Sequence, residues 1–309
     1  MLRTNQFLKF MVLVIIASAR NYKLQAESKS IVSYIKLDNA YFLSIGGFPP
    51  LNRNKYLQLF DMAKVSSTRT IYIDLLFSRP NSPSETGFEI AMNRRQKVIL
   101  PLTMTNEIFE ENYNENIKFF GNIIPAYKAV DNSPFEKSHG IILPHSTISA
   151  QSQYVCPASL RPQQRGDSIR TFYIAEYYKE HILPAVSICI LNSYLTGTGY
   201  RLELLKNGSE LFLMKEEKQR WLPKRRLHLA IQDGKEIPLT ITFEKLPSLS
   251  ATEIIRNKKT ASLNQIIILG TAADSIGTWV NTPVGLMSSG EVTANEVNTL
   301  WRMIQKDIR

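Results

Sequence analysis

The run from Gln265 to Leu269 constrains the fold more than any other feature of the chain. Its last four residues are Ile-Ile-Ile-Leu, and it stops at Gly270 and a group of small residues. A continuous aliphatic run of this length predicts a strand that is buried on both faces in the centre of a parallel sheet. Open α/β sheets place ligands and partners at the carboxyl ends of their strands. We therefore expect the loop from Gly270 to Thr282 to face a ligand or a partner.

The remaining chain alternates apolar strands with amphipathic helices, which is typical of α/β folds. Strands at 31–37, 70–77 and 97–102, linked by helices, are expected to form two right-handed crossover units of a parallel sheet. The other expected elements are strands at 140–144, 169–178 and 265–269, helices at 54–63, 184–194, 250–256 and 292–304, and a loop over the polar residues 145–165. The sequence thus predicts one large α/β domain with a largely parallel or mixed sheet flanked by helices. An antiparallel hairpin insertion is expected around Asn207-Gly208.

The N-terminus predicts export. Arg3 and Lys9 precede an apolar run over residues 10–16, and small residues follow at 17–19. This is the layout of a secretory signal, and the run is shorter than the ~20 residues that span a bilayer. We expect a signal peptide over residues 1–26, cleaved near residue 19 or 26, and a domain over 27–309 outside the cytoplasm, in the periplasm. The alternative is a domain tethered to the inner membrane by an uncleaved N-terminal segment.

The chain is basic, with a formal net charge of +10. An exported basic protein can attract anionic lipid, cell-wall polymer or an acidic partner, whereas nucleic acid is not an expected partner of such a protein. Residues 215–226 are interpreted as a solvated helix end and loop. The basic residues of this densest cluster are Lys215, Lys218, Arg220, Lys224, Arg225 and Arg226.

Two cysteines, Cys156 and Cys189, would meet an oxidising compartment after export. A disulfide between them is one outcome. The other is a buried thiol at Cys189, which lies in an apolar segment that predicts a helix. The sequence leaves both open.

Catalytic motifs are absent from the sequence. It contains neither a Gly-x-Ser-x-Gly elbow nor a Walker loop, and its four histidines form no HExxH pair. His139 and His145 could bind a metal from one strand, but a surface or capping role is the more common one for such residues. We therefore predict no enzyme activity, no catalytic residue, no metal and no cofactor.

Acidic residues at strand ends form the one polar constellation of interest. Asp38 and Asp74 are expected at the carboxyl edges of neighbouring parallel strands, where carboxylates can converge on a ligand or a metal. The alternative is that each caps the following loop or helix. The candidate residues for ligand or partner binding are Asp38, Asp74, Arg79, Gly270, Thr271, Asp274 and Thr282.

Several motifs in the same order resemble the second type of CHASE domain, an extracytoplasmic sensory domain of receptors with cyclase, kinase or diguanylate-cyclase outputs. The matching segments are 37–38 with 46–50, 73–80, 98–101, 166–170, 237–243, 267–270, 282–283 and 290–295. The chain departs from the family pattern at Thr278, where an acidic residue is usual, and at Thr293, where a histidine is usual. The resemblance implies a stand-alone sensory-type domain, because no output domain or second membrane span follows from the sequence.

These observations favour an exported, non-enzymatic module that binds an envelope or membrane protein, such as a receptor or a secretion-type complex. A periplasmic small-ligand binder that uses Asp38, Asp74 and the loop from Gly270 to Thr282 is the alternative. A metal-dependent hydrolase is the third hypothesis. The sequence does not predict an oligomeric state.

Overall fold

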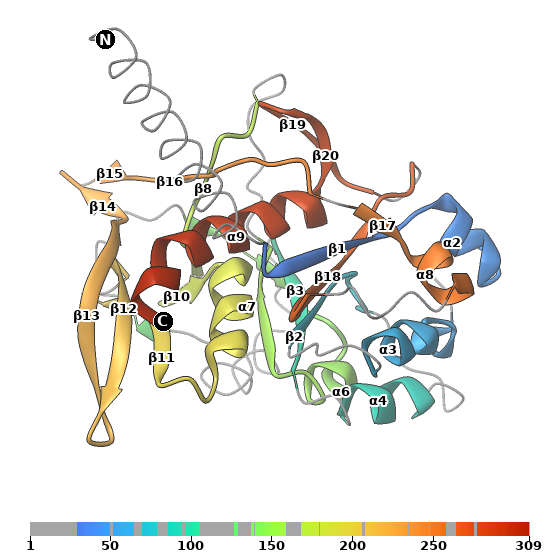
Figure 1. Ribbon diagram of the computed structural model, residues 1–309, viewed down its shortest axis with the longest axis horizontal. Coiled ribbons are helices and arrows are strands. Elements are labelled where there is room, and N and C mark those ends of the chain that lie inside the picture. The colour runs from blue at the N-terminus through green and yellow to red at the C-terminus, as the bar shows by residue number, and fades with distance from the viewer. Residues whose placement is uncertain are drawn as a thin grey trace, which may run out of the picture. The chain divides into compact units, whose positions relative to one another are not determined.

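A computed structural model describes the fold of this chain (Figure 1). The described residues are 30–49, 52–64, 70–78, 86–93, 97–105, 127–128, 137–138, 140–158, 168–178, 180–205, 208–233, 235–246, 248–257, 264–274 and 277–308. Arg79, His139 and the expected signal peptide lie outside them. The account below is of the unit from Val32 onward.

A seven-stranded mixed sheet forms the centre of the domain. Along the sheet the strand order is β17-β1-β18-β2-β3-β6, and β7 also pairs with β3. All pairings are parallel except that of β3 with β6. The strands are β1 (Val32–Leu37), β2 (Thr70–Asp74), β3 (Val98–Thr105), β6 (Gly140–Ile142), β7 (Tyr154–Pro157), β17 (Ser248–Ser250) and β18 (Ile266–Thr271).

The expected central strand is confirmed as β18, in which every residue is buried. Its position changes the expected connectivity, because β18 pairs with β1 on one side and with β2 on the other. The first two strands of the chain are therefore not neighbours, although both run parallel in the same sheet, and β2 pairs directly with β3, which agrees with the expected crossover units. A strand from the end of the chain can insert between them because parallel pairing depends on spatial proximity and not on sequence order.

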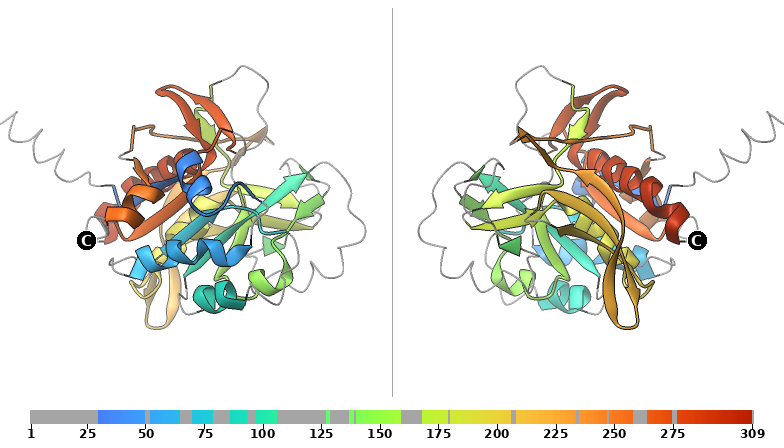
Figure 2. Two further views of the ribbon diagram at one scale, coloured as in Figure 1. Left: turned by 90° about the vertical axis from the view of Figure 1, so that its right-hand side faces the viewer. Right: turned by 90° about the vertical axis from the view of Figure 1, so that its left-hand side faces the viewer.

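Helices cover both faces of this sheet. Alternation along β18 turns Ile267 and Leu269 toward one apolar cluster, which includes side chains of the helices at the right in Figure 1. Those helices are α2 (Asn39–Ser44), η1 (Arg53–Tyr56), α3 (Leu57–Lys64), α4 (Thr86–Asn93) and α8 (Ala251–Asn257). The other face packs against α9 (Ser289–Ile308) and α7 (Val186–Leu195). Figure 2 shows α9, in red, alongside the sheet.

Smaller sheets surround this centre. The expected hairpin is confirmed by β11 (Tyr200–Leu205) and β12 (Glu210–Glu217), and β13 (Arg220–Leu229) adds a third antiparallel strand. The remaining strands are β4 (Tyr127–Lys128), β5 (Lys137–Ser138), β8 (Thr171–Phe172), β9 (Ala175–Tyr178), β10 (His181–Pro184), β14 (Ile231–Gln232), β15 (Lys235–Glu236), β16 (Leu239–Thr240), β19 (Trp279–Thr282) and β20 (Gly285–Ser288).

The structure corrects two local expectations. The polar stretch 145–165 is not a continuous loop, because it contains α6 (Ser146–Ser149) and the sheet strand β7. The basic cluster is not a helix end, since residues 215–226 form the paired strands β12 and β13 around the two-residue turn Lys218-Gln219. Both turn residues have positive φ, as the right-handed twist of a tight hairpin requires.

The question that the sequence left open for the cysteines is answered by a disulfide between Cys156 and Cys189. It joins β7 to α7. The bond closes a long segment of chain, so it stabilises the fold chiefly by restricting the unfolded chain, by about 2–4 kcal/mol.

Candidate functional site

Asp74 ends β2 and lies at the centre of a buried polar cluster. Its Oδ1 accepts a hydrogen bond of 3.0 Å from the Tyr72 hydroxyl, and its Oδ2 accepts one of 2.6 Å from the Ser289 hydroxyl. Its backbone carbonyl accepts a further bond of 3.0 Å from Thr271 Oγ1. Asp74 thus ties β2 to β18 and to the first residue of α9.

The beginning of α9 completes this cluster. Ser288 Oγ is hydrogen-bonded to the Tyr34 hydroxyl and accepts from the backbone N–H of Glu291 at 3.3 Å. Ser288 therefore caps the helix. The sequence Ser288-x-x-Glu291 has the residue types of a capping box, a signal that predicts a helix start here and not at Val292.

Two glycines let α9 approach β18 this closely. A Cβ built on Gly270 would lie 2.5 Å from Cε2 of Tyr34 and 3.0 Å from the Cα of Gly290. A Cβ on Gly290 would lie 2.7 Å from the Cα of Gly270. The backbones are in direct contact, so Gly270 has a packing role in this structure.

Burial shapes the electrostatics of the cluster. The pKa of Asp74 is raised by desolvation, against the opposing effect of its hydrogen bonds from Ser289 and Tyr72. The pKa of Glu291 is also raised by desolvation, and Lys36 and Lys245 partly offset this. Burial raises the pKa of Tyr34 and of Tyr72 as well, so both phenols keep their protons at physiological pH.

Asp38 does not join this cluster. It is the N-cap of α2, and its Oδ1 accepts the backbone N–H of Tyr41 at 2.9 Å. The expectation that Asp38 and Asp74 end neighbouring strands is wrong, because β18 lies between β1 and β2. The capping role that the sequence offered as the alternative is the one seen for Asp38.

The other candidate residues also make contacts within the chain. Asp274 Oδ2 accepts from Asn39 Nδ2 at 3.0 Å, and its backbone N–H donates to Asn39 Oδ1 at 3.2 Å, so the pair links the end of β18 to α2. Thr282 Oγ1 donates to the carbonyl of Gly285 at 2.6 Å and stabilises the turn between β19 and β20. Thr271 bonds Asp74, as described above. The binding roles predicted for these residues stay predictions.

Metal binding finds no support in the described part of the chain, which holds no group of three His, Cys, Asp or Glu that could bind an ion. His145 precedes α6, where its Nδ1 lies 3.1 Å from Thr147 Oγ1. The alternative of a metal shared with His139 involves a residue outside the described part of the chain.

Sequence reasoning missed the hairpin β19–β20, whose first strand forms the last four residues of the expected loop and whose second strand follows it. Three of its large apolar side chains are exposed: Trp279 by 37%, Val284 by 49% and Leu286 by 63%. Residues 275–290 contain no charged side chain. An uncharged stretch with a tryptophan is a signal that could have identified this segment as an exposed apolar hairpin.

The basic cluster has a structural role in part. Arg225 donates to the backbone carbonyl of Met303 and forms an ion pair of 3.0 Å with Asp307, and Lys224 donates to the carbonyl of Asp307 at 2.8 Å. These carbonyls belong to the last turns of α9, where positive charge is favoured by the helix dipole. β13 therefore holds the C-terminal end of α9.

The fold and the Asp74 cluster together define an α/β domain in which polar residues at the carboxyl ends of the central strands hold the long helix α9 against the sheet. Residues 6–309 match the family model of the CHASE2 domain. The chain belongs to the CHASE2 family, whose members are extracellular sensory domains. A search of curated proteins and a search of solved structures each found no match. No helix among the described residues is long and apolar enough to span a membrane.

Proposed function

We propose that this CHASE2 domain is exported and works as a non-enzymatic module that docks on an envelope protein, such as a membrane receptor or a secretion-type complex. The proposed docking surface is the hairpin β19–β20. The observation that carries the proposal is the exposure of Trp279, Val284 and Leu286 on a segment without charged residues.

The strand register places two of these side chains together. Trp279 pairs with Ser288, and Asn281 pairs with Leu286, so Trp279 and Leu286 are diagonal neighbours on one face of the hairpin. Val284 lies in the turn. The cores of protein interfaces are depleted in charge and enriched in aromatic residues, and tryptophan is frequent among the residues that dominate binding energy. This face has the composition of such a core.

The base of the hairpin is fixed. Met287 is buried, Ser288 caps α9, and the carbonyl of Asn281 accepts the backbone N–H of Ile169 at 2.8 Å. A surface that is held in place before binding loses little conformational entropy on docking. The geometry of β19–β20 thus supports a docking role.

Site-specific photo-crosslinking in living cells tests the proposal. A photoreactive residue at position 286 is expected to capture one envelope protein, identified by mass spectrometry. Ile90 on α4 is the matched control, because it is an apolar residue of similar exposure, 50%, outside the hairpin. Equal capture at positions 90 and 286, or capture at neither, would contradict the proposal.

Export itself is tested by the mass of the mature protein. Cleavage near residue 19 or 26 is expected to release the chain into the periplasm. An intact N-terminus in the membrane fraction would instead support the inner-membrane tether.

A further inference from the structure

A cleft separate from the Asp74 cluster lies between α7, β7 and the sheet β11–β12–β13. It has two lobes of about 230 and 260 Å³, which share Tyr154, Asn192 and Arg201 in their lining. Each lobe is below the ~300–1,000 Å³ that is typical of sites for drug-sized ligands. The size therefore suits a small metabolite.

The walls of this cleft are firmly connected. The Cys156–Cys189 disulfide joins β7 to α7, and Cys189 lines one lobe. The Asn192 amide donates to the carbonyl of Leu202 at 2.8 Å and accepts from its N–H at 2.6 Å, which ties α7 to β11. A cleft with fixed walls keeps its lining groups in position for a ligand.

Arg201 is the central cation of the cleft. Its guanidinium carbon lies 4.3 Å from the ring centroid of Trp221, and one terminal nitrogen bonds Glu203 at 2.5 Å. Its Nε is buried and has no hydrogen-bond acceptor among the described residues. The Arg201 side chain as a whole is 40% exposed, so its guanidinium can be reached from the cleft, and a ligand carboxylate would supply a further acceptor there.

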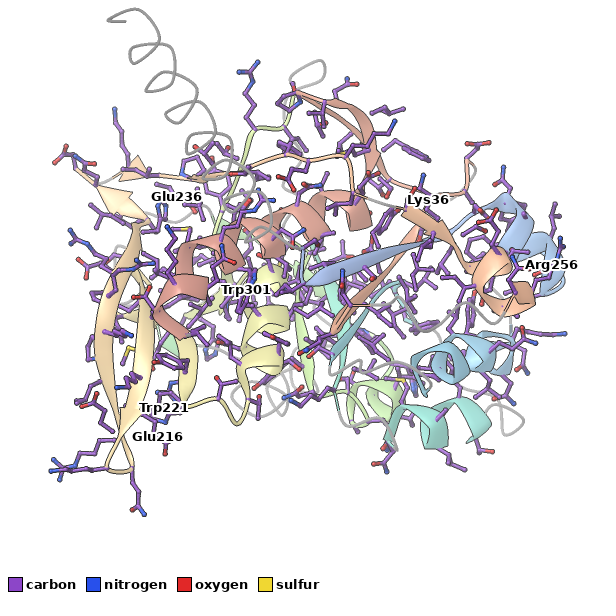
Figure 3. The ribbon with its side chains drawn as sticks, viewed as in Figure 1. Lys36, Glu216, Trp221, Glu236, Arg256 and Trp301 are labelled. Carbon is purple, nitrogen blue, oxygen red and sulfur yellow. A yellow bond between two sulfur atoms is a disulfide. The ribbon has the colours of Figure 1, made fainter. Side chains whose placement is uncertain are left out.

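The cleft also carries negative charge and aromatic surface. Glu203 lines one lobe and Glu216 the other. Glu216 pairs across the strands with Trp221, and Figure 3 shows both side chains near the end of the hairpin β12–β13. One cation and two carboxylates oppose a purely anionic ligand, whereas a ligand that bears both charges finds a partner for each.

We propose that this cleft binds a free α-amino acid. The ligand carboxylate accepts from the exposed part of the Arg201 guanidinium, and the ligand ammonium group lies toward Glu216. Tyr154 and Trp221, which line the lobe that contains Glu216, contact the side chain of the ligand with their rings. This inference is independent of the docking hairpin, so either proposal can fail alone.

Thermal shift and titration calorimetry with the full chain test the proposal. The probes are the L-amino acids, one at a time, and the controls are propionate, which has only the carboxylate, propylamine, which has only the amine, and glucose, which has neither charge. We expect saturable binding of one or more amino acids and none of the three controls. Binding of any of the three controls, or failure of every amino acid to bind, would overturn the proposal.

Neighbouring residues provide matched variants. Arg201→Gln and Glu216→Gln are each expected to weaken amino-acid binding by about tenfold or more, because each removes a charge-assisted hydrogen bond. Arg220→Gln and Glu217→Gln are the controls. Glu217 and Arg220 are opposite each other in the strand register, one position along from Glu216 and Trp221, so their side chains lie on the other face of the sheet. Unchanged affinity in Glu216→Gln, or an equal loss in Glu217→Gln, overturns the assignment even if Arg201→Gln does not fold.

Discussion

The junction between β18 and α9 and the hairpin β19–β20 that connects them place polar and apolar side chains in opposite ways. At the junction of β18 with α9, polar side chains and glycines are turned inward, where Asp74 and Ser289 bond each other and Gly270 contacts Gly290. In the hairpin β19–β20 between them, large apolar side chains are turned outward. The junction shows how buried polar groups fix the position of a helix, and the hairpin shows where apolar surface is left for a partner.

The largest effect is expected at the junction, from Gly290→Ala. The added Cβ would lie 2.7 Å from the Cα of Gly270, and a backbone atom cannot move aside as a side chain can. We expect a loss of about 1–3 kcal/mol in the free energy of unfolding, measured by chemical denaturation. Asn281→Ala on the exposed side of the hairpin is the control and should stay within about 0.5 kcal/mol of the wild type. If both variants unfold at the same denaturant concentration, the comparison between the two regions fails.

A smaller effect with a defined pH dependence is expected from Asp74→Asn. The pKa of Asp74 in the folded protein lies above its ordinary value of 3.8, so the folded state binds this proton more tightly than the unfolded chain does. As the pH falls from neutral toward 4, this carboxyl therefore makes the wild type more stable. The asparagine variant lacks that contribution.

The free energy of unfolding of both proteins, measured at several pH values, checks this prediction. The difference between them should shift in favour of the wild type as the pH falls. A constant difference over this range would show that the carboxyl does not experience the burial described for it.

The smallest effect on stability is expected in the hairpin, from Leu286→Ser. The side chain is 63% exposed, so its replacement should change the free energy of unfolding by no more than about 0.5 kcal/mol. The same substitution should reduce crosslinking from a photoreactive residue at position 284 to the envelope partner. A marked loss of stability would show instead that Leu286 belongs to the core.

Strongly periodic and fully apolar segments were predictable from the sequence. The aliphatic run 266–269 became β18, and the apolar residues 184–194 became α7, because burial selects these side chains whatever the neighbours are. The turn at Asn207-Gly208 correctly placed the hairpin of β11 with β12. In each case local sequence and tertiary environment favour the same structure.

The errors have physical causes as well. β7 is a short apolar run within a polar stretch, and its pairing with β3 and the disulfide at Cys156 hold it in the sheet. β13 is rich in lysine and arginine because it is an edge strand, where charge is tolerated and discourages further pairing. The insertion of β18 between β1 and β2 depends on contacts over long sequence distances, which no local pattern contains.

The candidate site was predicted only in part. A carboxylate after a strand predicts a polar edge, and Asp74 does lie at such an edge. The sequence offered capping as an alternative for Asp38, and that role is the one seen, but it could not tell that Ser289 and Tyr72 would donate to the oxygens of Asp74. Ser289 belongs to α9, and its approach to Asp74 accompanies the contact between Gly270 and Gly290, which no local pattern contains.

Helix α9 connects two surface hairpins that are distant in sequence. It begins directly after β20, and its last turns are held by Lys224 and Arg225 of β13. A helix of 20 residues is about 30 Å long and resists bending. The length of α9 therefore sets the spacing between the hairpin β19–β20 and the hairpin β12–β13. A shift of one hairpin along the helix axis would shift the other by the same amount.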